Sequence, residues 1–269
     1  MICTSKRGEQ EEVLDLKKGL SFFMILTVWI IGVSCAKQSI SPEPVIPQED
    51  TPEIVIEEKH SEFYMEEYSV EDVLTYFNEI VLRTEYATGD GDAALVQRWD
   101  VPICYQFVGE HTKKDVKILK KFFSELNKVE GFAGVTEATE GETPNLYIYF
   151  EGRAAFNDRY MEFLQDEYAD GATRYWYYTD TNDIYEGTIG YCTDMDKEVR
   201  KSVLLEEIVN CLGTGDTTLR EDSIVYQYGS DAKTLSDMDW LIIKLLYHPR
   251  IRCGMDAAQC EEVIRELYY

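Results

Sequence analysis

The chain has 269 residues, of which 45% are apolar and 13% aromatic, and its formal net charge at pH 7 is −25. This length and apolar content are enough for one sizeable hydrophobic core, and two separate domains are not expected. The acidity argues against nucleic acid as a partner, because a nucleic-acid-binding surface needs clustered lysines and arginines. It argues equally against direct adsorption to anionic lipid headgroups.

The N-terminal segment has the features of an export signal. A pair of lysines precedes an apolar run, residues 19–33, which at about fifteen residues is short for a membrane-spanning helix. The run ends in Gly-Val-Ser before Cys35, which resembles the bacterial lipobox that precedes a lipid-modified cysteine, although Gly32 replaces the usual aliphatic residue. We therefore expect residues 1–35 to be a lipoprotein signal peptide and Cys35 to be the lipid attachment site. The protein would then be anchored in the bacterial cell envelope, outside the cytoplasm.

Two alternatives stay open at this end of the chain. The apolar run could be an uncleaved signal anchor with an incidental cysteine. Residues 1–16 are acidic and would make a poor positive start for a signal, so translation beginning near Leu16 is a further hypothesis.

Residues 36–67 have the composition of an extended linker. They hold four prolines and nine acidic residues against two lysines, so low apolar content and self-repelling charge keep the segment solvated. The short Ile-Val-Ile run at 54–56 is its one element that could pair with a sheet edge. The folded domain is expected to occupy residues 68–269.

This domain alternates helical and strand patterns. Apolar residues spaced three and four apart predict helices over residues 69–86, 112–129 and 155–167. Alternating apolar residues predict strands over residues 101–108, 145–150, 173–179 and 186–193, the last two joined by a polar turn. The pattern predicts an α+β fold, a mixed sheet with packed helices followed by a helical C-terminal part.

A further helix is expected after the last strand, with Asp194 or Asp196 capping its start and Gly213 ending it. Its apolar arc consists of Val203, Leu204, Leu205, Ile208, Cys211 and Leu212. At about 100° per residue, Glu206 and Asn210 lie together opposite that arc. The simplest interpretation is a solvated polar stripe on an amphipathic helix.

Residues 206–213 run Glu-Glu-Ile-Val-Asn-Cys-Leu-Gly and resemble the active-site helix of the zincin metallopeptidases. In that helix, His-Glu-x-x-His followed by x-Leu-Gly places two zinc-binding histidines on one face beside a general-base glutamate. Here Glu206 and Asn210 take the places of the lost metal ligands, and Glu207 alone matches the motif. The resemblance implies a zincin-like fold, with Glu207 as the one candidate catalytic residue.

A second segment extends this resemblance. Residues 235–250 run Leu-Ser-Asp-Met-Asp-Trp-Leu-Ile-Ile-Lys-Leu-Leu-Tyr-His-Pro-Arg, and Gly254-Met255 follows. Together, the two segments are similar to a bacterial domain-of-unknown-function family of secreted proteins and lipoproteins that is grouped with the zincin-like peptidases. The similarity spans roughly residues 70–269, and a family so named implies no established reaction.

The histidines do not suit a zinc site. The chain has three, His60, His111 and His248, and no two of them have the spacing of metal ligands. We therefore expect no metal and no cofactor. Glu206 with a remote carboxylate could still hold a harder cation such as Ca²⁺.

Five cysteines fall in the exported part: Cys104, Cys192, Cys211, Cys253 and Cys260. The number is odd, so at most two disulfides can form among them. Cys253 and Cys260 are the pair favoured by proximity in the chain. Buried free thiols are an equal alternative.

The zincin resemblance also implies that the last strands of the sheet lie beside the active-site helix. Several tyrosines of those strands could then line a cleft next to Glu206, Glu207 and Asn210, and an aromatic cleft would suit a peptide or glycan ligand. The candidates are Tyr175, Tyr177, Tyr178, Tyr185 and Tyr191. Ordinary packing within the sheet is the alternative interpretation.

Three functional interpretations follow. The preferred one is a surface lipoprotein whose degenerate zincin-like domain has lost metal chemistry and serves in binding or envelope structure, which would make it no enzyme. The second is a secreted metal-dependent peptidase or hydrolase that uses Glu207 with atypical ligands. The third is an interaction module whose likeness to zincins is only architectural.

Overall fold

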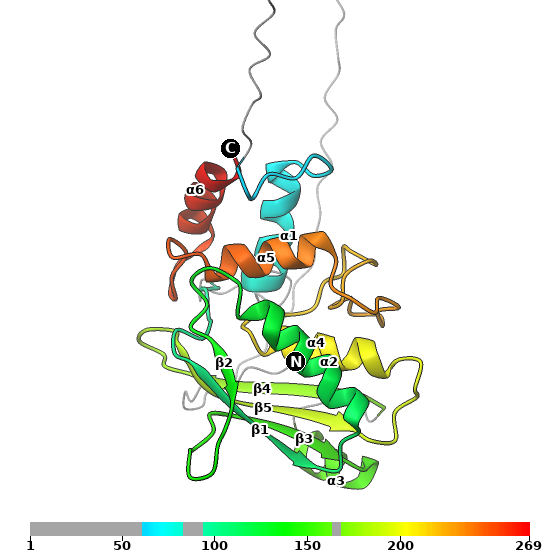
Figure 1. Cartoon of the computed structure of the whole chain (residues 1–269). Coiled ribbons are helices and arrows are strands. Elements are labelled where there is room, and N and C mark those ends of the chain that lie inside the picture. The colour runs from blue at the N-terminus through cyan, green and yellow to red at the C-terminus, as the bar shows by residue number, and fades with distance from the viewer. Residues whose placement is uncertain (1–60, 83–93, 163–167) are drawn as a thin grey trace, which may run out of the picture. The chain divides into compact units, whose positions relative to one another are not determined.

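The structure is a computed structural model that describes residues 61–82, 94–162 and 168–269. The expected signal peptide with Cys35, most of the expected linker, and His60 lie outside the described residues. The described part is an α+β domain with a five-stranded mixed sheet, helices packed on the sheet and a helical C-terminal part (Figure 1). The predicted fold class is confirmed.

The sheet has the strand order β2-β1-β3-β5-β4. Its strands are β1 Ile103–Gly109, β2 Val135–Glu137, β3 Leu146–Glu151, β4 Gly171–Tyr177 and β5 Ile184–Cys192. The pairs β1–β2, β1–β3 and β3–β5 are parallel, whereas β4 runs antiparallel to β5 and forms an edge. In the central register, Ile148 of β3 pairs with Phe107 of β1 and with Ile189 of β5.

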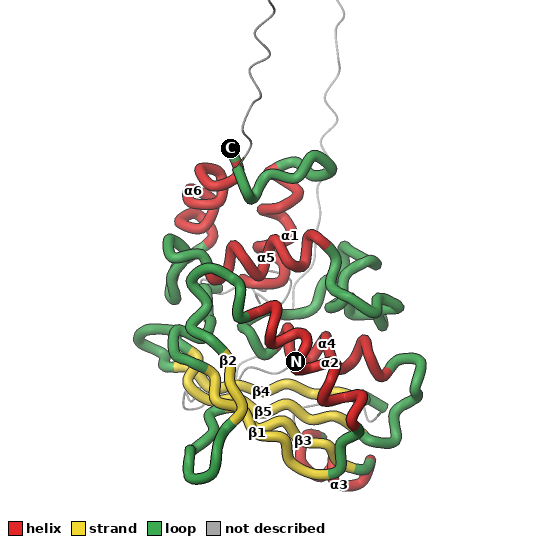
Figure 2. The backbone as a smooth tube through the Cα atoms, in the orientation of Figure 1, coloured by secondary structure: helices red, strands yellow, loops and turns green. Residues whose placement is uncertain are grey.

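The helices are α1 Val70–Leu82, α2 Lys113–Leu126, α3 Arg153–Tyr160, α4 Arg200–Asn210, α5 Asp237–Tyr247 and α6 Ala257–Tyr268. Helices α2 and α4 cover one face of the sheet, and α3 packs on the other face against β3 and β5 (Figures 1 and 2). Helix α1 packs against α5 and α6, and these three lie beyond α2 and α4. The main core therefore lies between the sheet and two successive sets of helices.

Local sequence explains most of these elements. In β3, Leu146, Ile148 and Phe150 are buried while the residues between them are partly exposed, as expected for a strand with period two. Helix α2 begins with a capping box in which Thr112 and Asp115 satisfy each other's backbone N–H groups. Helices α5 and α6 start with the same device.

Two local features differ from the sequence prediction. The three-residue strand β2 was not predicted, because it is too short to show an alternating pattern. The predicted caps of the helix after β5 are wrong: α4 follows Val199, which makes no side-chain cap. Asp194 instead accepts a hydrogen bond from the Arg153 backbone N–H (2.7 Å) at the start of α3, and Asp196 accepts one from Glu198 N–H (2.9 Å).

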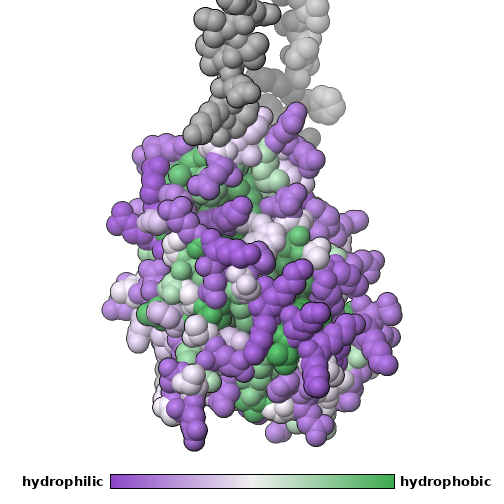
Figure 3. Space-filling view, viewed as in Figure 1, coloured by the Kyte–Doolittle hydropathy of each residue, from purple (hydrophilic) through white to green (hydrophobic). Residues whose placement is uncertain are grey.

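The first described residues pack on the domain, although they fall within the expected linker. Phe63 is buried in the main core, and the Ser61 hydroxyl donates to the Tyr268 carbonyl (3.0 Å). No helix in the described ranges has both the length and the apolar character needed to cross a membrane. The face that carries α2 is largely hydrophilic and is interrupted by separate hydrophobic patches (Figure 3).

Candidate functional site

The candidate helix α4 lies close against β4 and β5, and two glycines of the sheet permit this approach. A Cβ atom on Gly171 would lie 2.6 Å from the Glu207 side chain and 2.7 Å from Val203 Cγ1. A Cβ atom on Gly187 would lie 3.2 Å from the Cys211 sulfur. The side chains of Val203, Glu207 and Cys211 therefore form the stripe of α4 that faces the sheet.

Glu207, the candidate catalytic residue, is buried between this helix and β4, with only 8% of its surface exposed. The Thr173 hydroxyl donates to Glu207 Oε2 at 2.7 Å and also lies 2.7 Å from the Glu207 carbonyl. Burial raises the pKa of Glu207 to about 7, since a buried carboxylate loses its hydration. The residue thus links helix to sheet and carries a proton more readily than an ordinary glutamate.

The residues at the expected ligand places, Glu206 and Asn210, also make contacts within the fold. Asn210 is only 2% exposed, and its Nδ2 donates to Asp216 Oδ1 at 2.7 Å. Glu206 is half-buried, and its burial, together with the charges of Glu207 and Asp216, raises its pKa well above the ordinary value. The expectation that Glu206 and Asn210 form a solvated polar stripe is therefore wrong for Asn210, which is buried, whereas Glu206 keeps part of its surface exposed.

The end of α4 is held by buried side chains from distant parts of the chain. Trp99 Nε1 donates to the Cys211 carbonyl (2.7 Å), and the Tyr247 hydroxyl donates to the Leu212 carbonyl (2.9 Å). These bonds satisfy carbonyls that a helix end leaves without partners. Gly213 then ends the helix as predicted: it has φ +106°, and a Cβ there would lie 1.9 Å from the Gln97 carbonyl oxygen.

Residues of the second segment of the family resemblance, 235–250 with Gly254-Met255, likewise make hydrogen bonds within the fold. Asp239 of α5 is buried and accepts from the Tyr76 hydroxyl (2.8 Å), the Ser223 hydroxyl (2.8 Å) and the Ile224 N–H (3.1 Å). Met255, of the Gly-Met pair, accepts from the Val96 N–H through its carbonyl at 2.9 Å. The residues that carry the resemblance thus fix α1, α4 and α5 to one another and to the chain before β1.

Sequence reasoning missed two groups that matter at this site. Thr173, the partner of Glu207, has no signal of its own in a strand rich in aromatic residues. Glu79 of α1 is buried, and it accepts from the Thr217 and Thr218 hydroxyls and from the Thr218 N–H (2.5–2.9 Å), which fixes the segment after α4. An acidic residue in the apolar run of α1 was the available signal for Glu79.

Glu206, Glu207 and Asn210 do not form a zinc site of the zincin kind. Glu207 and Asn210 are committed to Thr173 and Asp216. Of the histidines in the described ranges, His111 lies against Phe107 and Phe150, and His248 follows α5 beside Phe63. Within those ranges, no three carboxylate, thiol or imidazole ligands that include Glu206 or Glu207 come within 4.8 Å of one another, which also leaves a Ca²⁺ site there unsupported.

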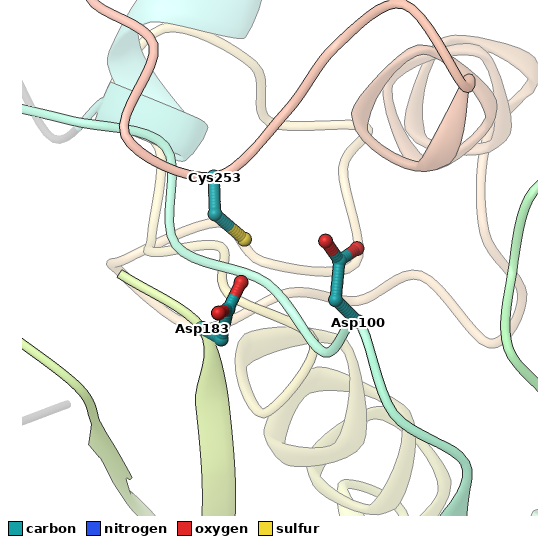
Figure 4. A group of neighbouring side chains, drawn as sticks. All are labelled: Asp100, Asp183 and Cys253. Carbon is teal, nitrogen blue, oxygen red and sulfur yellow. The ribbon is translucent and has the colours of Figure 1, made fainter. Parts of the chain in front are cut away.

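A different trio is grouped closely enough to hold a cation. Ligand atoms of Asp100, Asp183 and Cys253 lie within 4.8 Å of one another, and the side chains converge from three separate segments (Figure 4). However, Arg98 forms an ion pair with Asp100 at 2.9 Å, so a cation already neutralises one carboxylate. Burial, and then a hydrogen bond with Asp183, raise the pKa of the Cys253 thiol to about 12, whereas a metal ligand must be a thiolate. The trio is accounted for as a hydrogen-bonded junction of loops.

The predicted tyrosine cleft is wrong for two of its members. Tyr175 and Tyr191 are fully buried: the Tyr191 hydroxyl donates to the Leu204 carbonyl (2.7 Å), and the Tyr175 hydroxyl donates to Gln97 (3.2 Å). Tyr177 is partly buried against the main core. Tyr178 and Tyr185 are exposed and pair with their ring centroids 4.5 Å apart, near the turn between β4 and β5. The tyrosines facing α4 thus serve packing.

The suggested disulfide is not formed. Cys253 and Cys260 are free thiols, as are Cys104, Cys192 and Cys211. Cys260 is buried on α6, whereas the Cys253 thiol is directed to the Arg98 carbonyl at 3.6 Å. The two side chains therefore lie in different environments, although they are only seven residues apart in the sequence.

These features define a class: an α+β domain whose mixed sheet ends in an antiparallel edge strand, with a polar helix fixed beside that strand by buried hydrogen bonds. The chain belongs to the family described as protein of unknown function (DUF2927), whose model matches residues 70–266. The match extends from the start of α1 almost to the end of α6. The expected membership of a domain-of-unknown-function family is thereby confirmed. No curated protein matches the chain.

Proposed function

We propose that this protein is a lipid-anchored, extracytoplasmic binding protein of the bacterial envelope, whose domain descends from zincin-like peptidases and has lost their metal chemistry. Two features support the ancestry. The octet Glu-Glu-Ile-Val-Asn-Cys-Leu-Gly spans the second half of α4 and the turn after it. Helix α4 also lies beside the last two strands, β4 and β5, which is where the zincin resemblance places an active-site helix.

One observation supports the proposed loss of catalysis. The residue at the place of the general base, Glu207, is buried and hydrogen-bonded to Thr173, and the residue at the second ligand place, Asn210, is hydrogen-bonded to Asp216. A general base must reach the proton that it removes, in a pocket that admits substrate. Glu207 and Asn210 are instead buried, and their hydrogen bonds hold the helix in place.

Metal analysis and a peptidase assay test the proposal together. The purified full-length protein would be incubated with Zn²⁺, desalted and analysed for bound metal, then assayed on a mixed peptide library. We expect neither stoichiometric zinc nor peptide hydrolysis. Zinc bound one-to-one, lost in Glu206→Ala and retained in the control variant Glu198→Ala, at an exposed position just before α4, would overturn the proposal.

The alternative is a secreted metal-dependent hydrolase that uses Glu207 with atypical ligands. The observation in its favour is the raised pKa of Glu207, since active sites tune carboxyl groups in this direction. Peptide hydrolysis that disappears in Glu207→Gln while the variant stays folded would establish it. Binding of a peptide or glycan without turnover supports the first proposal.

The lipid anchor is a separate part of the proposal. It rests on the apolar run that ends at Cys35. When the protein is expressed in bacteria fed a labelled fatty acid, we expect the label on the wild type and on Cys253→Ala, and none on Cys35→Ala. Labelling of Cys35→Ala would exclude Cys35 as the attachment site.

A further inference from the structure

An apolar groove edged by lysines lies on the helical side of the domain, away from Glu207. It has a volume of about 610 Å³ and runs between α2, the start of α4, residues 234–235 and the start of α5. Hydrophobic patches interrupt the hydrophilic surface on the face that carries α2 (Figure 3), and the groove lies beside that helix. A volume of this size is in the range of ligand-binding clefts.

The floor of this groove is apolar and only partly covered. Ile118, Leu235 and Trp240 pack against the main core but keep part of their surface exposed. The Trp240 ring rests on buried Phe122, with centroids 5.6 Å apart, so its position is fixed from below. A partly exposed tryptophan on a rigid support is a typical anchor for an apolar side chain of a partner.

The rim carries a concentration of positive charge that is unusual in this chain. Four lysines line the groove, Lys114, Lys117, Lys121 and Lys201, against a single acidic residue, Glu125, which is itself ion-paired with Lys128 (2.8 Å). The first three repeat on one face of α2, and none of the four forms an ion pair with any residue in the described ranges. The formal net charge of the chain is −25, so four lysines against one acidic residue make this groove a local basic region that attracts anions.

We propose that this groove, which we call the lysine groove, binds an acidic amphipathic helix of a partner protein. Its exposed apolar floor would take leucine-like side chains spaced three and four apart, and its lysines would pair with carboxylates flanking them. The chemistry of groove and partner is complementary in both respects. A small inorganic anion would leave the apolar floor unused, and an anionic bilayer would be repelled by the net charge.

The probe is a synthetic helical peptide with leucines at i, i+3, i+4 and i+7 and glutamates elsewhere, and its control is the same peptide with lysines for glutamates. Binding to the full-length protein would be measured by calorimetry at low and high salt. We expect the acidic peptide alone to bind, with an affinity that falls as the salt concentration rises.

Paired variants locate the site. Lys117→Glu with Lys121→Glu reverses two charges of the groove, and we expect binding to weaken roughly ten- to a hundredfold. The control, Lys113→Glu with Lys120→Glu, reverses two charges of the same helix outside the groove and should alter affinity less than about threefold. Because Lys120 is ion-paired with Glu137 (2.6 Å), circular dichroism is used to check that this variant keeps the fold. Leu235→Ser tests the floor, and it should weaken binding while circular dichroism shows the same fold.

Three results would overturn the proposal. They are no binding of the acidic peptide, equal weakening by both pairs of lysine variants, and equal binding of the basic peptide. Binding confined to anionic phospholipid vesicles, lost in the groove variants, would replace it with a lipid site. The proposal does not depend on the loss of zinc chemistry at α4, because none of these measurements involves Glu207.

Discussion

The most informative single change is Glu207→Gln, which removes the charge of a buried carboxyl and keeps its shape. Glutamine retains a carbonyl oxygen to accept from the Thr173 hydroxyl, so the link between α4 and β4 is preserved. Burial raises the pKa of Glu207 to about 7 from an ordinary 4.5. At about 1.4 kcal/mol per pH unit, this difference corresponds to about 3 kcal/mol in the free energy of unfolding.

The sign of the effect follows from proton binding. Between about pH 4.5 and pH 7 the folded protein holds the Glu207 proton and the unfolded chain releases it, so the wild type loses stability as the pH rises through this interval. Glu207→Gln lacks that loss. We therefore expect the variant to match the wild type near pH 4 and to exceed it by about 3 kcal/mol near pH 8.

Urea denaturation from about pH 4 to pH 8 measures this difference. Glu198→Gln, at an exposed position just before α4, is the control and should follow the wild-type curve. A stability difference between Glu207→Gln and the wild type that does not change with pH would refute the reasoning. So would a variant that becomes less stable than the wild type as the pH rises.

Three further predictions concern packing, ion pairing and thiols. Gly171→Ala should lower the free energy of unfolding by about 1–3 kcal/mol, since its Cβ would lie 2.6 Å from the Glu207 side chain. The control Gly152→Ala, where the nearest atom to a Cβ would be 3.7 Å away, should change the free energy of unfolding by less than about 1 kcal/mol. Equal effects of the two substitutions in thermal denaturation would contradict this prediction. Asp115→Asn should cost about 3–5 kcal/mol, because Asp115 is fully buried and makes two 2.8 Å bonds to Arg200. Burial would raise the pKa of Asp115, but hydrogen bonds from Arg200 and Thr112 outweigh burial and lower the pKa. The wild type should therefore lose this stability as the pH falls, and the variant should not. Parallel dependence of stability on pH in the two proteins would contradict the ion pair's role. A reductant should leave the melting temperature unchanged, because the cysteines of the described residues are free thiols, and a lower melting temperature under reduction would reveal a disulfide.

Local patterns were sufficient to predict most elements of the domain. The alternation in β3 and the capping signals of α2 and α5 depend on residues a few positions apart, so they are visible in the sequence. The strand β2 is an exception, since its three residues are ordered by pairing with β1. The caps expected for α4 failed for a related reason: Asp194 is drawn to the Arg153 backbone, 41 positions away.

The candidate site was harder to predict because its chemistry depends on distant partners. The motif drew attention to Glu206, Glu207 and Asn210, which lie on one helix. The burial of Glu207 depends on Thr173, which is 34 positions away, and on Gly171, which lets the helix lie close to the sheet. Helical periodicity assigned Asn210 to solvent, but Asn210 is buried and hydrogen-bonded to Asp216 of the segment that follows α4.

The pairing of α1 with α6 has a consequence for how this domain reaches its native state. The apolar face of α1 is buried by helices that come last in the chain, and Ser61 is hydrogen-bonded to Tyr268 across 207 positions. Contacts of such long range close large loops and therefore form late in folding. A nascent domain would keep α1 exposed until α6 has emerged, so this step is the one most open to aggregation and to help from a chaperone.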